Sequence, residues 1–377
     1  MIRRSFLQSG LAATAISTGL INSVTAADEP LTEFPRIKIG QIGVRHEHAS
    51  GKMNTLKMLP QYYEIVGIAA ESPDEEARHK NDAIYKNVKW MSQEELLAQP
   101  GLEAIAVETE MTETIPTALK CAEKGLHLHI DKPLGQDLDQ LRALFEVCRK
   151  NRVIVQPGYM FRTNQAFRLL LQAYRSGWLG ELHEIQLDMC RNDTSKGFRK
   201  WLASYRGGGM YDFGSHLVDF VAELLGPPES VTVFERPDPN DSLSDNTLSV
   251  LLYRKAIAEI RVSLRKINGF STRRMAAHGT KGSFVVDPIE NWAFDVDPET
   301  KMRMLNVTLT LQEDNDTYKK GVNKLKLPQF PDRYYGQLKD FALFIRGKKE
   351  NPYTFEYELM SQKLILAASG YIPWTDK

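Results

Sequence analysis

Three residues of this 377-residue chain have side chains suited to moving a proton to or from an oxygen atom. His216 carries an imidazole whose ordinary pKa of about 6.5 lets it accept a proton from a hydroxyl group at neutral pH. Asp212 stands four residues earlier, so on one helix both side chains project from the same face and the carboxylate can orient the ring. Lys132 can hold an oxygen by hydrogen bonding. Together they predict acid–base chemistry on a hydroxyl group, although a lone histidine on a helix is more often structural.

Strand and helix patterns alternate between residues 35 and 157. Short apolar segments predict strands at 37–43, 64–70, 103–107, 126–130 and 153–156. Helices are predicted at 53–59, 115–124 and 137–150, and the residues from Ser92 to Glu95 form a capping-box pattern that begins a further short helix. This alternation predicts a doubly wound parallel sheet. Lys132 follows its fourth strand, at the carboxyl end where such sheets bind ligands.

The pattern changes after residue 157, where alternating apolar and polar residues predict half-buried strands. These strands are predicted at 184–189, 230–234, 248–253, 256–264, 274–278 and 283–286. Helical patterns cover 165–175, 214–225, 334–346 and 357–368. The sequence therefore predicts an α/β protein in two parts. A Rossmann-like domain is expected over 28–157, and an α+β substrate-binding domain with a large, mainly antiparallel sheet is expected over 158–377.

The turn after the first strand is expected to hold a phosphate if the first domain binds a dinucleotide. Gly43 stands at the first position of the pattern G-x-G-x-x-G, whereas Arg45 and His48 replace the other two glycines. Gly43 permits the tight turn, Arg45 can meet a phosphate, and the N-terminus of the next helix offers free amides. Glu71 ends the second strand, where a carboxylate accepts hydrogen bonds from a ribose and disfavours a 2′-phosphate. These residues predict NAD over NADP, although a solvated loop carboxylate also accounts for Glu71.

Two histidine pairs, His46 with His48 and His127 with His129, raise the question of a metal site. Neither pair has clear carboxylate or cysteine partners at metal-ligand spacing, so we expect no metal. The three cysteines are an odd number and widely spaced, which predicts buried thiols and no disulfide framework.

A series of motifs, in order and spacing, resembles the Gfo/Idh/MocA family of nicotinamide-dependent oxidoreductases. The motifs are Glu123-Lys-Gly-Leu-His127, Asp131-Lys-Pro133, Gly158-Tyr159 with Arg162, Gly177-Trp-Leu-Gly180, Gly207-Gly-Gly-Met-Tyr-Asp-Phe-Gly-Ser-His216 and Gly279-Thr-Lys-Gly282. The resemblance implies that Lys132 and His216 are catalytic and that Asp212 assists them. It also implies that Thr109 begins the segment near the nicotinamide, although Glu110 and Met111 depart there from the family's Thr-Pro-Asn. Asp131 replaces the family's usual glutamate.

The resemblance implies an NAD-dependent oxidoreductase that transfers hydride at a CH–OH group of a sugar, cyclitol or glycoside. Lys132 is expected to contact the cofactor as well as the substrate. Asp212 and His216 are expected to contact the substrate. Arg162, Lys200 and Trp201 are expected to contact its polyol or acidic groups, with surface support as the alternative. Two alternatives stay open. One is a glycosidase or lyase of the same fold that uses NAD transiently, and the other is a catalytically silent carbohydrate-binding protein.

The first 27 residues have the features of a twin-arginine export signal. Arg3 and Arg4 form a charged tip, an apolar stretch follows over 11–24, and small residues at 24–26 fit a cleavage site. An ordinary secretory signal is the alternative. We therefore expect a periplasmic or secreted protein that keeps its NAD tightly bound.

The balance of charges disfavours two classes of partner. Cleavage of the signal removes two of 48 basic residues and none of 48 acidic residues, which leaves a net charge of −2. Nothing in this balance favours nucleic acid or an anionic membrane, and no later segment has the roughly 20 apolar residues of a transmembrane helix. The expected partner is a small carbohydrate or polyol. The oligomeric state stays open, a homo-oligomer included.

Overall fold

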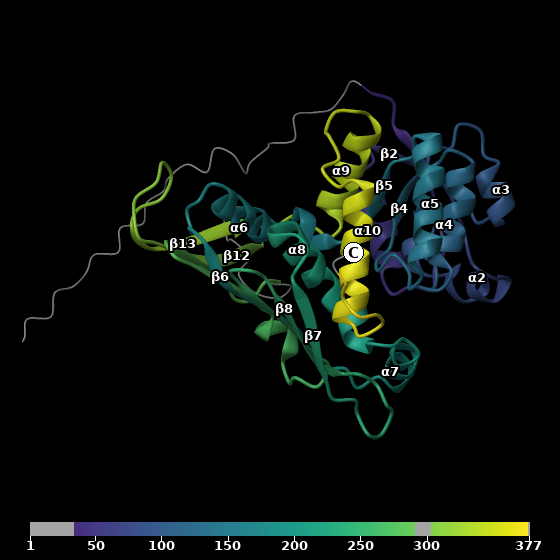
Figure 1. The fold of residues 1–377 in the computed structure, drawn as a ribbon. Coiled ribbons are helices and arrows are strands. Elements are labelled where there is room, and N and C mark those ends of the chain that lie inside the picture. The colour runs from purple at the N-terminus through teal and green to yellow at the C-terminus, as the bar shows by residue number, and fades with distance from the viewer. Residues whose placement is uncertain (1–33, 291–302, 376–377) are drawn as a thin grey trace, which may run out of the picture. The chain divides into compact units, whose positions relative to one another are not determined.

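The computed structural model describes residues 34–290 and 303–375, whose arrangement is shown in Figure 1. The predicted export signal at 1–27 lies outside the described residues. Within the described ranges, no helix combines the length and apolar composition that a membrane crossing requires.

The first half of the chain forms a five-stranded parallel sheet, as predicted. Its strands are β1 (Ile37–Ile42), β2 (Tyr63–Ala69), β3 (Ala104–Val107), β4 (His127–Ile130) and β5 (Val155–Pro157). They lie in the order β2-β1-β3-β4-β5, and every neighbouring pair is parallel. The order reverses between β1 and β3, and in doubly wound sheets ligands bind at the carboxyl ends of the strands beside such a reversal.

Helices cover both faces of this sheet. Those of the first half are α1 (Ala49–Met58), α2 (Pro73–His79), α3 (Gln93–Leu97), α4 (Thr114–Glu123) and α5 (Leu138–Asn151), with a short 3-10 turn η1 (Ala83–Tyr85). Leu128 of β4 shares a buried cluster with residues of α4 and α5. Its neighbour His129 points to the opposite face, where it contacts Phe341 of α9 (Tyr335–Ile345) with ring centroids 5.9 Å apart. A helix from the end of the chain therefore completes the first sheet. Ser92 begins α3 with the predicted capping box.

The second half forms an eight-stranded, mainly antiparallel sheet, which confirms the predicted fold class. Its strands are β6 (Leu182–Cys190), β7 (Ser230–Glu235), β8 (Asn246–Leu252), β9 (Ile257–Ser263), β10 (Arg274–Gly279), β11 (Gly282–Val286), β12 (Met304–Leu311) and β13 (Gly321–Pro328). They lie in the order β13-β12-β11-β10-β6-β9-β8-β7, and only β6 and β9 pair in parallel. Strands β12 and β13 were not predicted. Along both of them, more buried and more exposed residues alternate, as they do in the strands that were predicted.

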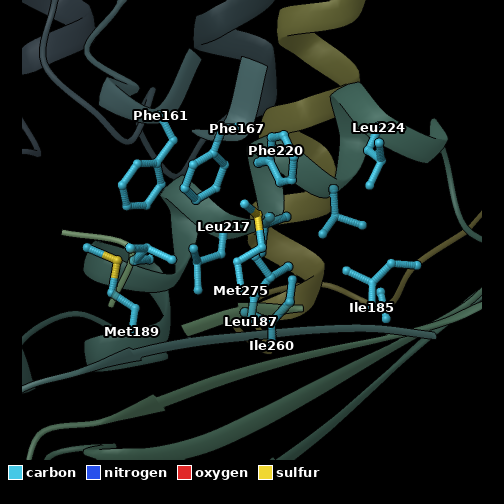
Figure 2. Close-up of a cluster of buried hydrophobic side chains, with 14 of the residues drawn as sticks. Phe161, Phe167, Ile185, Leu187, Met189, Leu217, Phe220, Leu224, Ile260 and Met275 are labelled. Atoms are coloured by element: carbon cyan, nitrogen blue, oxygen red, sulfur yellow. The ribbon is translucent and has the colours of Figure 1, made fainter. Parts of the chain in front are cut away.

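Helices pack on one face of this second sheet and enclose the larger core. The helical elements are η2 (Met160–Thr163), α6 (Gln165–Arg175), α7 (Lys196–Ala203), a π-helical turn (Met210–Gly214), α8 (Ser215–Leu225), η4 (Gly269–Thr272) and α10 (Phe355–Ala368). Figure 2 shows Phe167 of α6 and Phe220 of α8 facing Leu187 and Ile260 of the strands. Full burial of a side chain of this size contributes about 1.5–3 kcal/mol.

Helix α10 contacts elements of both halves. Its Phe355 stacks on Phe145 of α5 with ring centroids 4.8 Å apart. At its other end, the backbone carbonyl of Ala368 accepts a hydrogen bond from the Ser249 hydroxyl of β8 at 2.5 Å. The last helices of the chain therefore tie the two sheets together.

Candidate active site at the carboxyl ends of the parallel strands

Lys132 and Asp212 form a buried ion pair beyond the carboxyl end of β4. Lys132 stands two residues after the strand, and Asp212 lies in the π-helical turn that precedes α8. The Lys132 ammonium group contacts the Asp212 carboxylate and also donates to the Asp212 backbone carbonyl at 2.8 Å. Both residues are about 1 % exposed. The structure thus brings together two predicted site residues that lie 80 positions apart in the chain.

His216 lies in the first turn of α8 and is almost completely buried. Its Nδ1 atom has no hydrogen-bond partner, and its ring packs against Tyr159 and Phe161 with centroids 6.0 and 5.6 Å away. Burial, followed by the positive charge of Lys132, holds the pKa of His216 well below its usual value. The imidazole is therefore neutral near pH 7 and able to accept a proton.

Asp212 does not orient the His216 ring, contrary to what the four-residue spacing predicted. One carboxylate oxygen of Asp212 faces Lys132, and the other is buried without a partner. The reason is local, because residues 210–214 form a π-helical turn with hydrogen bonds from i to i+5. Residues four apart are then no longer aligned, and the ring is placed by its aromatic neighbours.

The turn after β1 retains one feature of a dinucleotide-binding loop. Gly43 has a φ of +102°, and an added Cβ atom would lie 2.4 Å from the backbone of Glu108. Only glycine lets the turn pass so close to the end of β3. The Arg45 side chain is 55 % exposed and pairs with Glu110 at 3.2 Å.

Glu71 has one carboxylate oxygen without a partner beside the turn after β1. Its Oε2 atom accepts a hydrogen bond from the Val44 amide at 3.2 Å, whereas its Oε1 atom is buried without a partner. A buried acceptor without a donor costs free energy, so this oxygen is available to a hydrogen-bond donor of a ligand.

His46 and His48 turn inward to Asp131. The Nδ1 atoms of His46 and His48 lie 2.6 Å and 3.1 Å from Oδ2 of Asp131, and the ammonium group of Lys52 lies 3.6 Å from Oδ1. His48 was expected to contact the cofactor, but its ring contacts Asp131 instead. A buried carboxylate is stable only when hydrogen-bond or charge partners surround it.

Lys52 on α1 anchors further buried polar groups that the sequence analysis missed. Its ammonium group lies 2.7 Å from Nε2 of His129 and 3.4 Å from Oε1 of Glu108. Glu108 directly follows β3, just as Asp131 directly follows β4. Charged residues directly after buried parallel strands lie at the ligand-binding ends of the sheet, and this signal would have identified Glu108.

Burial and neighbouring charges determine which of these groups carry a proton. Burial alone would raise the pKa of Asp131, but the adjacent histidines hold it well below its usual range. Burial raises the pKa of Glu108 to about 8. Burial would also raise the pKa of Glu47, but the hydrogen bond and charge of His48 lower it to about 2. At neutral pH, Asp131 and Glu47 are therefore ionised and Glu108 is protonated.

Glu110 connects the segment after β3 to α7. One of its oxygens accepts hydrogen bonds from the Trp201 indole at 2.8 Å and from the Tyr205 hydroxyl, and the other oxygen faces Arg45. Trp201, predicted to contact substrate, therefore lies beside the predicted cofactor loop. Thr109 is buried directly before Glu110.

Arg162 and Lys200, also predicted to contact substrate, lie in different environments. Arg162 is buried and makes bidentate contacts with Asp219 of α8, at 2.7 and 2.9 Å, and with Glu358 of α10, at 2.6 and 2.8 Å. Both sides of its guanidinium group are occupied by carboxylates, which gives Arg162 a structural role in place of a substrate contact. Lys200 is exposed on α7.

Arg191 lies beside the same site and was not identified from the sequence. Its guanidinium group lies 4.9 Å from the ring of Phe213, and the Lys132 ammonium group lies 5.8 Å from that ring. Arg191 pairs with Asp193 at 2.9 Å, while its Nε atom is buried without a partner.

Two family models match the chain. A model described as an oxidoreductase family with an NAD-binding Rossmann fold matches residues 37–159. The model of the GFO/IDH/MocA C-terminal domain matches residues 167–285. Together they cover well over half of the chain.

Related sequences and structures agree with these matches. An oxidoreductase of Synechocystis sp. is 24% identical over 277 residues, which cover 68% of this chain and 73% of that protein. A trans-1,2-dihydrobenzene-1,2-diol dehydrogenase of Bos taurus is 26% identical over 202 residues, or 52% of this chain and 58% of that protein. A 3-ketoreductase of Actinomadura kijaniata, solved with TDP-benzene and NADP, shares the fold with a TM-score of 0.69 at 17% identity. That match covers 88% of this chain and 96% of the ketoreductase.

Proposed function

This chain belongs to the Gfo/Idh/MocA family of oxidoreductases, and we propose that it uses NAD to oxidise a CH–OH group of a sugar, cyclitol or glycoside. The observation that carries the proposal is the neutral, buried imidazole of His216 within the field of the Lys132–Asp212 pair. The names of two relatives, a diol dehydrogenase and a 3-ketoreductase, support redox chemistry at a carbon that bears oxygen.

Lys132 holds the substrate oxygen, and His216 takes its proton. An ammonium group has three donors, and Asp212 receives two of those of Lys132 through its carboxylate and its carbonyl. The third donor is left for a substrate oxygen. The neutral ring of His216 accepts the hydroxyl proton, and the nicotinamide ring, when bound, accepts the hydride. The contacts with Asp212 hold the Lys132 ammonium group in place.

NAD would be held at its adenosine end by Glu71 and at the turn by Gly43 and Arg45. The unpartnered Oε1 atom of Glu71 accepts a hydrogen bond from a ribose hydroxyl and repels a 2′-phosphate, which supports NAD over NADP. The exposed Arg45 can turn from Glu110 to a phosphate. Thr109 lines the segment that follows β3.

Export to the periplasm or beyond makes the cofactor a prosthetic group. The twin-arginine route carries folded proteins, so NAD is loaded before export and stays bound. A cofactor kept bound outside the cytoplasm would have to be restored in each cycle, either by reduction of a second sugar-like substrate or by return of the hydride to an oxidised intermediate of the first. Return of the hydride to the oxidised intermediate would make the protein a glycosidase or lyase with transient redox chemistry.

The test is to purify the exported protein without nucleotide, denature it and quantify the dinucleotide released. We expect stoichiometric NAD, and turnover on sugars or polyols without added cofactor. Protein that is empty and works only with excess free NAD contradicts tight binding, and protein that neither carries nor binds NAD supports the silent carbohydrate-binding alternative. Product analysis separates a net-oxidised sugar from a cleaved one.

A further inference from the structure

Three side chains at the carboxyl ends of β1 and β4 converge as metal ligands do. Nδ1 of His46 and Nδ1 of His48 approach the same oxygen of Asp131, at 2.6 and 3.1 Å. One ligand atom from each of the three residues lies within 4.8 Å of the others. Bonds of about 2.0–2.2 Å to a central ion span at most about 4.4 Å, so small side-chain rotations bring all three atoms to bonding distance.

We propose that His46, His48 and Asp131 form a binding site for a divalent transition-metal ion such as Zn²⁺. Two imidazoles and one carboxylate are a donor set that suits zinc and its first-row neighbours. This inference is independent of the dinucleotide and of the substrate proposed above.

The charges around the cluster also favour a divalent cation. The cluster holds the carboxylate of Asp131, and Glu47 lies 3.5 Å from His48. Glu108 and Asp131 both approach the buried ammonium group of Lys52, at 3.4 and 3.6 Å. The nearby Lys132 and Arg191 are each already paired with another aspartate. In a metal-bound state, in which ligand histidines are neutral, ionisation of all three carboxyl groups against the charge of Lys52 would leave a formal charge of −2, which a divalent ion neutralises.

A bound cation would change the protonation state of Glu108. Its Oε2 atom is buried with no hydrogen-bond partner, and without a cation its carboxyl group is protonated at neutral pH. Buried charges require pairing or metal coordination. A cation at the Asp131 carboxylate supplies the positive charge that lets Glu108 ionise.

The surroundings supply outer contacts that metal-bound histidines use. Oε1 of Glu47 lies 3.5 Å from Nε2 of His48, an arrangement in which a carboxylate orients a histidine ligand. The Lys52 ammonium group lies 3.6 Å from Oδ1 of Asp131, whereas the two imidazoles approach Oδ2. Three protein ligands leave a coordination position open for water or a substrate oxygen, beside Lys132.

The experiment titrates the chelator-treated, untagged mature protein with Zn²⁺ alone, followed by calorimetry, and with Co²⁺, followed by visible absorption. The expected result is one Zn²⁺ per chain and Co²⁺ bands of a site with nitrogen ligands. His46→Gln and His48→Gln, which keep a polar side chain of similar size, should each lower the affinity at least about tenfold. Glu47→Gln should lower it by roughly 10–100-fold, as loss of an outer-shell partner does.

His183→Gln is the matched control, because His183 is exposed on β6 and belongs to no such cluster. It should bind Zn²⁺ like the wild type. If the histidine variants fail to fold by circular dichroism, X-ray absorption of the Zn²⁺-loaded wild type counts the imidazole ligands directly. Absence of stoichiometric binding, a spectrum without two imidazoles, or unchanged affinity in folded His46→Gln and His48→Gln would overturn the proposal. NAD plays no part in these measurements, so a failure of the proposed redox function leaves their outcome unaffected.

Discussion

At the scale of single residues, the site depends on which buried groups carry a proton. Burial favours the neutral form of every ionisable group, and neighbouring charges then decide the outcome. His216 has a positive neighbour in Lys132 and is neutral. Asp131 has histidine and lysine neighbours and is ionised, whereas burial dominates at Glu108 and keeps it protonated.

We expect His216→Ala and Lys132→Ala each to lower turnover by roughly 10² to 10⁴, the usual range for lost acid–base catalysis. The physical reason is that the first removes the proton acceptor and the second removes the donor that holds the substrate oxygen. Steady-state kinetics on a sugar or polyol that the protein oxidises measures the effect. Lys150→Ala, at an exposed position of α5, is the control and should leave turnover unchanged.

The pH dependence of turnover gives a second check on His216. The ring must be neutral to accept a proton, and its pKa is well below the usual 6.5. Turnover should therefore persist as the pH falls through 6.5 and decline only at lower pH. An acid limb centred at or above 6.5 would remove His216 as the base.

Glu108→Gln tests the protonated carboxyl group. The folded state of the wild type holds a proton on Glu108 up to a pH of about 8, whereas the unfolded chain loses it near 4.5. Stability due to this group therefore falls as the pH rises between these values, by up to about 1.4 kcal/mol per pH unit. Glutamine mimics the neutral acid and does not titrate. The stability of the variant relative to the wild type should therefore rise as the pH increases across this window.

Urea denaturation of metal-free protein at both ends of this window measures that difference. Glu94→Gln, at an exposed position of α3, should follow the wild type throughout. A constant difference between Glu108→Gln and the wild type would show that Glu108 is ionised in the folded protein.

At the scale of elements, α10 holds the site by linking elements of both halves. Arg162 pairs with Asp219 of α8 and Glu358 of α10, and all three side chains are at most 5 % exposed. Asp219 lies one turn after His216 on α8, so this network fixes the helix that carries His216. On its outer side, α10 is joined to α5 by the exposed pair of Glu356 with Arg149.

These two arginines bind carboxylates of the same helix but should differ in their effect on stability. Arg162→Ala leaves two buried carboxylates without their counter-charge and should lower the free energy of unfolding by about 3–5 kcal/mol. Arg149→Ala breaks a pair whose side chains are more than half exposed and should cost about 0–1 kcal/mol. Chemical denaturation compares them. Combining Arg162→Met with Asp219→Asn and Glu358→Gln should recover most of the lost stability, because no uncompensated charge then remains. Equal effects of Arg162→Ala and Arg149→Ala on stability would contradict the structural role of the buried Arg162 network.

At the scale of the whole molecule, function depends on where the chain works and what it carries there. Two sheets and the helices that join them leave Glu71, Lys132 and His216 at positions set by packing far from each residue. Such a protein can be exported with its cofactor only if it folds first, which is what the predicted twin-arginine signal implies.

Replacement of both Arg3 and Arg4 by lysine should leave the precursor in the cytoplasm, because the signal is recognised through the arginine pair. Fractionation and N-terminal sequencing measure the outcome, and the mature N-terminus is expected after Ala26 or Ala27. Mature protein that still appears outside under a block of the twin-arginine pathway would support the ordinary secretory signal instead.

The sequence alone determined the class of fold and the place of Lys132 beyond a parallel strand. Apolar segments of strand length between helical patterns report local structure and the face that each element buries, and this information lies within a few neighbouring residues. The capping box at Ser92 and the glycine at 43 were visible for the same reason, because each depends on the local backbone.

Only the tertiary structure decided which side chains meet. The partners of Lys132, His48 and Arg162 come from segments tens to hundreds of residues away. Which partner each side chain meets depends on how whole layers of the fold pack, and no local sequence pattern encodes this packing. The return of α9 to the first sheet is of the same kind. Burial also sets the protonation states of His216 and Glu108, through desolvation. Desolvation arises only once the chain has folded.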